Sequence, residues 1–120
     1  PEMSVVAVAS ISATAGQTGL SAYCATKGAL IAAVRSLAAE YAPRGIRFNC
    51  VSPAPVDTPM QRATRERLGD TWYQKEVLDR AKLGTLAPED VADPILFLLS
   101  DASRRITGVN LTIDGGWSFA

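Results

Sequence analysis

Tyr23 and Lys27, four residues apart, are the side chains of this sequence best suited to moving a proton. At the start of a helix this spacing places both on one face. A free phenol is a poor base at neutral pH, but a nearby ammonium group and the positive end of the helix dipole both favour its ionised form. A tyrosine placed in this way can exchange a proton with an alcohol oxygen. The pair alone is weak support, because most such pairs are a packed phenol and a solvated lysine.

Ser10 adds a hydroxyl group to this pair. It lies at the carboxyl end of a strand that we expect over residues 4–10, in the segment that leads into the helix of Tyr23. Its hydroxyl could hydrogen-bond the same substrate oxygen and stabilise the charge that develops there. The three groups together predict the reaction centre of an enzyme that interconverts carbonyls and alcohols.

The composition argues against several other functions. The sequence has no histidine, and Cys24 and Cys50 have no metal-type spacing, so we expect no metal site and two free thiols in a reducing cytoplasm. Twelve basic and twelve acidic residues give a net charge of zero, so no basic surface favours nucleic acid or a membrane. No apolar run reaches the roughly 20 residues that span a bilayer.

The elements around the three groups alternate between strand and helix. The valine-rich run of residues 4–10 is typical of a strand buried on both faces. Residues 11–20 read as a loop, and Ser21 is expected to cap a helix over residues 22–41. Alanines leave much of this helix smooth, which favours close packing, as at a subunit interface. Its apolar stripe is expected to consist of Leu30, Val34 and Leu37.

Two further strands are expected over residues 46–52 and 108–113, the first preceded by a left-handed turn at Gly45. Strands that alternate with helices indicate an α/β protein with a parallel sheet and right-handed crossovers. The first strand has an uncovered edge in this arrangement, which suggests that more sheet precedes it.

The segments between these two strands are expected to shape a pocket. The proline-rich loop of residues 53–59 leaves the carboxyl end of a strand, where open α/β sheets bind ligands. Residues 60–84 predict one or two short helices, in which Trp72 and Tyr73 either line the pocket or anchor the packing. A helix that begins near Pro88 is expected to kink or restart at Pro94. The segment after the last strand is expected to be a sharp turn and a short tail.

Collinear segments of the chain resemble the short-chain dehydrogenase/reductase family. The resemblance covers essentially all 120 residues. The end of the chain is similar to the compact subfamily with a single Rossmann-type domain. The matching segments are Ser10 with Tyr23-Cys-Ala-Thr-Lys27, residues 44–53, residues 55–60, residues 88–92 with 98–101, and residues 106–116.

The resemblance implies a role for each group. Tyr23 would be the catalytic acid/base, Lys27 would make the phenol more acidic and bind the nicotinamide ribose, and Ser10 would orient the substrate carbonyl. NAD or NADP would be the cofactor, and an alcohol or ketone the substrate. The implied cofactor-binding residues are Tyr23, Lys27, Pro53, Ala54, Val56 and Thr58, and the implied substrate-binding residues are Ser10, Ser12, Met60 and Trp72.

The implied fold is the C-terminal half of a Rossmann-like doubly wound parallel sheet, with residues 1–120 as part of one domain and residues 59–85 as its lid. The family's Gly-rich phosphate loop does not occur in this sequence, so we expect the N-terminal cofactor-binding half to lie outside it. Ala54 also replaces the glycine of the family's Pro-Gly motif, which could restrict the loop.

Two functions follow from this combination. The chain is the catalytic half of an oxidoreductase that assembles as a dimer or tetramer, or it is a remnant without cofactor binding that acts as a non-enzymatic dimerisation module.

Overall fold

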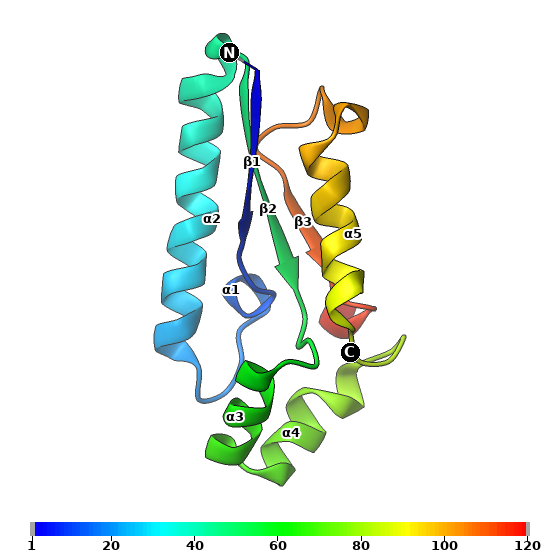
Figure 1. The fold of residues 1–120 in the computed structure, drawn as a ribbon. Helices are drawn as coiled ribbons and strands as arrows, with labels where there is room; N and C mark the ends of the chain where they lie inside the picture. The colour runs from blue at the N-terminus through cyan, green and yellow to red at the C-terminus, as the bar shows by residue number, and fades with distance from the viewer. Residues whose placement is uncertain (1, 120) are drawn as a thin grey trace.

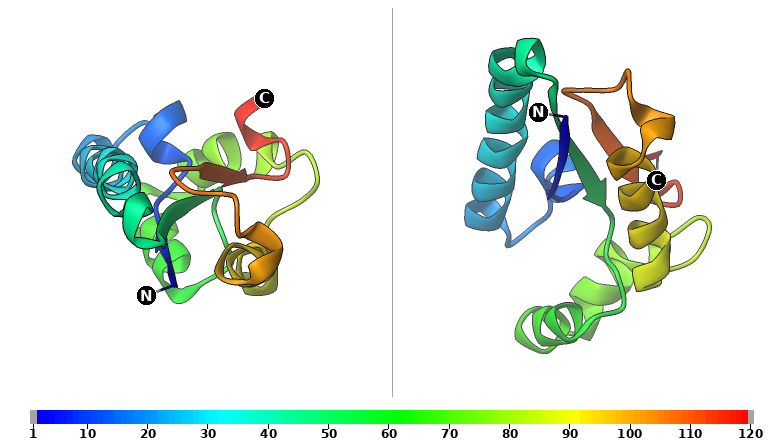
Figure 2. Two further views of the ribbon diagram at one scale, coloured as in Figure 1. Left: turned by 90° about the horizontal axis from the view of Figure 1, so that it is seen from above. Right: turned by 45° about the horizontal axis from the view of Figure 1, so that its top comes forward.

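The computed structural model describes residues 2–119, which form a three-stranded parallel sheet with helices on both faces (Figure 1). The strands are β1 (Met3–Val8), β2 (Ile46–Pro53) and β3 (Asn110–Ile113), and β2 lies in the centre. Helix α2 (Ser21–Tyr41) covers one face and α5 (Pro88–Leu99) the other, as the view along the strands in Figure 2 shows. The expected α/β fold with a parallel sheet is confirmed.

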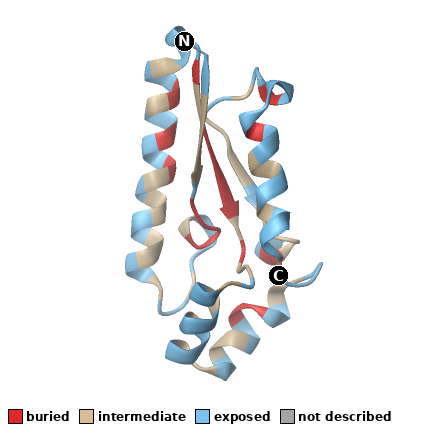
Figure 3. Ribbon diagram, viewed as in Figure 1, coloured by how far each residue is buried: buried red, intermediate tan, exposed pale blue. Residues whose placement is uncertain are grey.

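The central strand β2 is buried along most of its length (Figure 3), as expected for a strand covered on both faces. Two of its fully buried residues are polar and satisfied. The Asn49 amide donates to the Ile106 carbonyl (3.0 Å) and accepts from the Val109 N–H (3.0 Å). The Ser52 hydroxyl donates to Asn110 Oδ1 (2.6 Å). Because unpaired buried polar groups are costly, these bonds favour a single position of β3 beside β2.

The region between β1 and α2 differs from the sequence prediction. Strand β1 ends at Val8 rather than at Ser10, and the expected loop contains a one-turn helix, α1 (Ser12–Ala15). Ser21 is the first residue of α2 and does not cap it, because the N-cap position belongs to Leu20, which has no capping side chain. A capping residue has non-helical backbone angles, and Leu20 has them (φ −124°, ψ 26°), whereas Ser21 is already helical.

The buried side of α2 is also rotated from the predicted stripe. Its buried residues are Ile31, Val34 and Ala38, whereas Leu30 and Leu37 are only half-buried. The apolar periodicity is shared by two neighbouring lines of residues, and contact with the sheet selects one of them. The left-handed turn predicted at Gly45 is confirmed, with a φ of 74° after the short helix η1 (Ala42–Arg44).

The segment after β2 forms two short helices, as predicted. They are α3 (Pro59–Leu68) and α4 (Asp70–Glu76), followed by η2 (Leu78–Arg80). Thr58 caps α3 by accepting a hydrogen bond from the Gln61 N–H (3.3 Å). In Figure 1 both helices lie beyond the ends of the strands, where β2 leaves the sheet.

Helix α5 runs through Pro94 without the restart that was one of the two predicted outcomes. Proline removes the hydrogen bond that the Asp90 carbonyl would accept, but Asp90 is exposed, so water can satisfy this carbonyl. The end of the helix is held firmly: Leu98 is buried, and its carbonyl accepts from the hydroxyls of Ser4 (2.8 Å) and Ser103 in η3 (Asp101–Ser103) (2.9 Å). These contacts outweigh the single missing bond.

The segment after β3 is a part of the core and not a loose tail. Trp117, in η4 (Trp117–Phe119), is 1% exposed, and its indole N–H donates to the Glu76 carbonyl (2.7 Å). The Arg80 guanidinium lies 3.6 Å from the centre of the indole ring. Trp117 therefore joins the end of the sheet to the segment around α4.

Asp114 holds the turn that presents Trp117. Its carboxylate accepts hydrogen bonds from the N–H groups of Gly116 (3.0 Å) and Ser118 (2.9 Å). Burial raises the pKa of Asp114, but the bonds from Ser118 and Gly116 outweigh burial and leave this pKa below its ordinary value.

The two cysteines are free thiols. Cys50 is buried in β2, where burial raises the pKa of its thiol against a smaller opposing effect of Arg35. None of the helices within residues 2–119 combines the length and the apolar character needed to cross a membrane.

We expect Asp114→Ala in the whole protein to lower the free energy of unfolding by about 1–2 kcal/mol at neutral pH, because the turn loses its charged acceptor. A carboxyl whose pKa is lower in the folded protein stabilises the fold only while it is ionised. The difference between the variants should therefore shrink as the pH falls below about 4. Urea unfolding at a series of pH values measures this. Asp93→Ala is the matched control, because this exposed carboxylate forms no ion pair within residues 2–119. A difference in unfolding free energy between Asp114→Ala and the unmodified protein that grows as the pH falls would contradict the prediction.

Candidate active site

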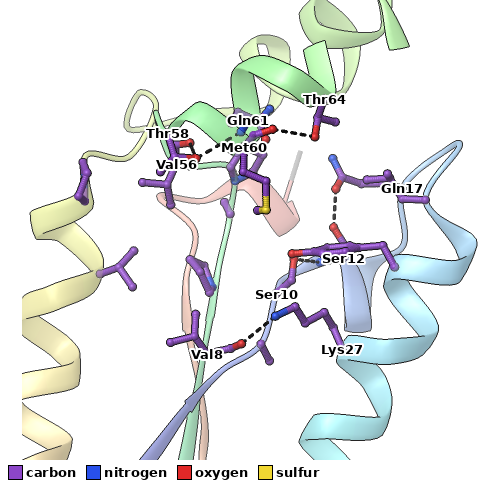
Figure 4. A pocket seen from close by; sticks show the side chains of 18 of the residues that line it. Val8, Ser10, Ser12, Gln17, Lys27, Val56, Thr58, Met60, Gln61 and Thr64 are labelled. Atoms are coloured by element: carbon purple, nitrogen blue, oxygen red, sulfur yellow. Dashed lines mark hydrogen bonds between the residues drawn. The ribbon is translucent and has the colours of Figure 1, made fainter. Parts of the chain in front are cut away.

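A cavity of about 550 Å³ opens where β1 and β2 end, between α2 and the helix α3 (Figure 4). Its size is in the range of small-molecule sites. All ten residues that the sequence nominated for catalysis, cofactor binding or substrate binding line it: Ser10, Ser12, Tyr23, Lys27, Pro53, Ala54, Val56, Thr58, Met60 and Trp72.

The first side of the cavity carries the hydroxyl, the phenol and the ammonium group. Ser10 is buried just after β1, and its Oγ accepts a hydrogen bond from the Ser12 N–H (3.2 Å). Tyr23 and Lys27 extend from the first two turns of α2. The Lys27 ammonium donates to the Val8 carbonyl at the end of β1 (3.0 Å) and lies 5.8 Å from the centre of the Tyr23 ring. A single backbone carbonyl thus positions the lysine beside the phenol and the serine.

The opposite side of the cavity is formed by the chain that leaves β2. Val56 forms an isolated parallel bridge with Leu86, in which the Asp57 N–H donates to the Leu86 carbonyl (3.0 Å). In this parallel bridge the residues on either side of Val56 bond to Leu86, so the bridge does not use the N–H of Val56 itself. The Val56 carbonyl accepts from the Thr58 hydroxyl (3.3 Å).

Ala54 does not strain this loop. Within residues 2–119, no residue other than glycine has a positive φ, so Ala54 adopts a backbone conformation open to any amino acid. Its side chain is buried against Ile11 and Trp117, and its N–H donates to the Ile113 carbonyl (2.9 Å). A restriction that arises from a positive φ is therefore absent at this position.

The two neighbouring aromatic residues of α4 separate into the two roles left open by the sequence. Trp72 lines the cavity, and its indole N–H donates to the Thr18 carbonyl (2.9 Å) in the segment between α1 and α2. Tyr73 is not among the lining residues. The Arg65 guanidinium packs over its ring, 4.5 Å from the ring centre.

Sequence reasoning missed four polar lining residues: Gln17, Gln61, Thr64 and Arg67. A signal for two of them was present, because Met60, Thr64 and Arg67 are four and three residues apart and share one face of α3. Gln17 carried no such signal. Its side chain is held by a local contact, in which its amide oxygen accepts a hydrogen bond from the hydroxyl of Ser12, five residues earlier.

The lining residues suit the nicotinamide end of a dinucleotide. A carboxamide needs both a donor and an acceptor, and the backbone of Val56 offers an N–H and a carbonyl beside the cavity, with the Thr58 hydroxyl next to them. The Lys27 ammonium can donate to ribose hydroxyls in addition to the Val8 carbonyl, because an ammonium group has three donors.

Comparisons with known proteins identify the family. Residues 1–118 match the family model described as enoyl-(acyl carrier protein) reductase. The chain is 39% identical to (+)-borneol dehydrogenase 2 from Salvia officinalis, covering 96% of this chain and 43% of that protein. It is 44% identical to L-xylulose reductase from Bos taurus, covering 94% of this chain and 46% of that protein.

Solved structures give the same result. The chain superposes with a TM-score of 0.84 on a 3-ketoacyl-(acyl-carrier-protein) reductase from Brucella melitensis complexed with NADH, at 33% identity, covering 98% of this chain and 45% of that one. The TM-score is 0.89 for a putative NAD(P) dependent gluconate 5-dehydrogenase from Beutenbergia cavernae with bound NADP, at 32% identity, covering 99% of this chain and 47% of that one. The chain thus spans a little under half the length of these relatives.

We expect Trp72→Phe to loosen the segment around Thr18 without unfolding the sheet, since the ring is kept and one hydrogen bond is lost. One such bond contributes about 1 kcal/mol, which corresponds to roughly fivefold faster amide exchange in residues 16–20. Hydrogen exchange followed by mass spectrometry on the whole protein measures this. Tyr73→Phe is the control, and unchanged exchange near Thr18 in Trp72→Phe would refute the contact's role.

Proposed function

The chain belongs to the short-chain dehydrogenase/reductase family, and from this premise we propose that its parent protein transfers a hydride between a nicotinamide cofactor and a secondary alcohol or ketone. The observation that carries the proposal is the meeting of Ser10, Tyr23 and Lys27 in one cavity.

Tyr23 acts as the general acid and base. When a ketone is reduced, its phenol gives a proton to the carbonyl oxygen as the carbon is reduced; when an alcohol is oxidised, it takes the proton back. The cavity lining contains no histidine and no carboxylate that could do this instead.

Lys27 places a positive charge beside the phenol during this transfer. Its ammonium donates to the Val8 carbonyl and lies 5.8 Å from the centre of the Tyr23 ring. It would also bind the nicotinamide ribose, so that one side chain serves both the acid/base and the cofactor.

Ser10 orients the substrate carbonyl. Its Oγ already accepts a hydrogen bond from the Ser12 N–H, which leaves the hydroxyl proton free to be donated. A donor aimed at the carbonyl oxygen polarises it and stabilises the negative charge that develops there. Ser12 and Met60 complete the proposed substrate side with Trp72.

NAD or NADP would be held at its nicotinamide end by Val56, Thr58, Tyr23 and Lys27, beside Pro53 and Ala54. When bound, the cofactor supplies or accepts the hydride. The pyrophosphate grip is proposed to come from a part of the protein outside this chain, and residues 59–85 are proposed to act as the substrate lid.

We also propose that the protein assembles as a dimer or tetramer through α2. This helix exposes a line of small side chains at three- and four-residue spacings, on which a second helix could approach closely: Ala22, Ala25, Ala29, Ala32, Ser36 and Ala39. The same face would serve the non-enzymatic alternative, in which a remnant acts by association alone.

Ala29→Glu should shift the assembled protein toward its monomer, because a charged side chain would be buried between two closely packed helices. Size-exclusion chromatography with light scattering measures the mass. Ala63→Glu, on the exposed side of α3, should leave the mass unchanged. A normal oligomer in the α2 variant would remove this face from the assembly.

Tyr23→Phe in the whole protein should reduce kcat by about 10²- to 10⁴-fold, with cofactor affinity changed little, since the ring remains and only the proton is lost. Steady-state kinetics and cofactor titration separate the two effects. Tyr73→Phe, the same change at a tyrosine outside the cavity, should keep full turnover. Turnover retained in Tyr23→Phe would sink the proposed mechanism.

A further inference from the structure

The three arginines of α3 differ in their surroundings. Arg62 pairs with Asp57 (3.2 Å), and Arg65 pairs with Asp70 (2.8 Å) and stacks on Tyr73. Arg67 has neither an ion pair nor a hydrogen bond to another of the residues 2–119. It is also the only one of the three that lines the cavity.

The rest of the cavity wall has donors left over and no negative charge. No aspartate or glutamate is among the lining residues. The amide nitrogens of Gln17 and Gln61 are buried and have no hydrogen-bond partner within the described chain. Both side chains come from the elements that face each other across the opening in Figure 4.

The hydroxyl groups of this wall are already engaged as donors. The Ser12 hydroxyl donates to Gln17, the Thr58 hydroxyl to the Val56 carbonyl, and the Thr64 hydroxyl to the Met60 carbonyl. This part of the cavity therefore has a guanidinium without a partner among the described residues, and two unpartnered amide N–H groups lie buried in its wall. A ligand group complementary to such a wall has acceptor oxygens and a negative charge.

We propose that Arg67 is a specificity-determining residue that selects substrates with an anionic group, a carboxylate or a phosphate, remote from the reacting carbonyl. This inference rests on the proposed function, because it assigns the far end of the substrate whose carbonyl meets Ser10 and Tyr23. Arg67 is exposed, so it lies at the open side of the cavity and can bind this group as the substrate enters.

The test uses the whole protein and a series of straight-chain oxo acids of increasing length, each with its methyl ester and with the ketone phosphate ester of matching length. We expect kcat/KM to be about tenfold or more higher for an acid or phosphate than for the neutral ester. The preference should fall as ionic strength rises, because the guanidinium is exposed. Whether carboxylate or phosphate is favoured identifies the anion.

Arg67→Met should abolish the preference by lowering kcat/KM for the anionic substrates while leaving the ester unchanged. Arg67→Lys should restore part of it. Arg62→Met, which removes an equal charge from the same helix outside the cavity, is the matched control and should keep the preference. Equal turnover of acid and ester by the unmodified protein overturns the inference, as does an Arg67→Met variant that loses affinity for NAD or NADP with its acid preference intact.

A binding measurement separates this inference from the proposed function. Trp72 lines the cavity, so its fluorescence should report occupancy by the same acids and esters without turnover, and Trp72→Phe identifies its signal. If no ketone is reduced, the proposed function fails, but tighter binding of the acid that disappears in Arg67→Met still supports the anion site. Equal binding of acid and ester overturns it.

Discussion

The parallel pairing of β1 with β2 is the constraint on which the rest of the site depends. The pairing continues past the end of β1, since the N–H groups of Ala9 and Ile11 donate to the carbonyls of Val51 (2.8 Å) and Pro53 (3.0 Å). Ser10, between these two bonds, is thereby held next to the loop that leaves β2. Parallel strands bring their carboxyl ends to one edge of the sheet, so a serine early in the chain and a proline-rich loop far along it border the same cavity.

The helices complete the cavity through a few directed contacts. Lys27 ties the start of α2 to the Val8 carbonyl, Trp72 ties α4 to the Thr18 carbonyl, and Trp117 ties the end of the sheet to the Glu76 carbonyl. In each case a side-chain N–H satisfies a backbone carbonyl that lies at the end of a strand or helix or in a loop. The chain is elongated, 48 × 26 × 25 Å, with α3 and α4 beyond the strand ends, so these bonds and not a broad core hold that part in place.

The two sides of the cavity have different chemical characters, which accounts for how one cavity could serve two ligands. Near the strand ends, Ser10, Tyr23 and Lys27 form a compact set suited to one oxygen and one ribose. On the side of α3, the lining includes a guanidinium without an ion pair and two amide nitrogens unpartnered within residues 2–119, and no carboxylate is among the lining residues. A substrate placed with its carbonyl at the first set would present its far end to the second, so the proposed selection by charge would act at a distance from the proposed chemistry.

The sequence by itself determined the order of the main strands and helices and the left-handed turn at Gly45, because periodicity and glycine conformation are local properties. It also nominated Ser10, Tyr23 and Lys27, through their types, their spacing and the family resemblance, and all three line one cavity. Tertiary structure decided the rest. It chose which line of α2 is buried, carried α5 through Pro94, made Trp117 a core residue, and turned Trp72 but not Tyr73 into the cavity. Each of these outcomes depends on a partner distant in sequence, such as Ser4 for the end of α5 or Glu76 for Trp117, and no local pattern records such a partner.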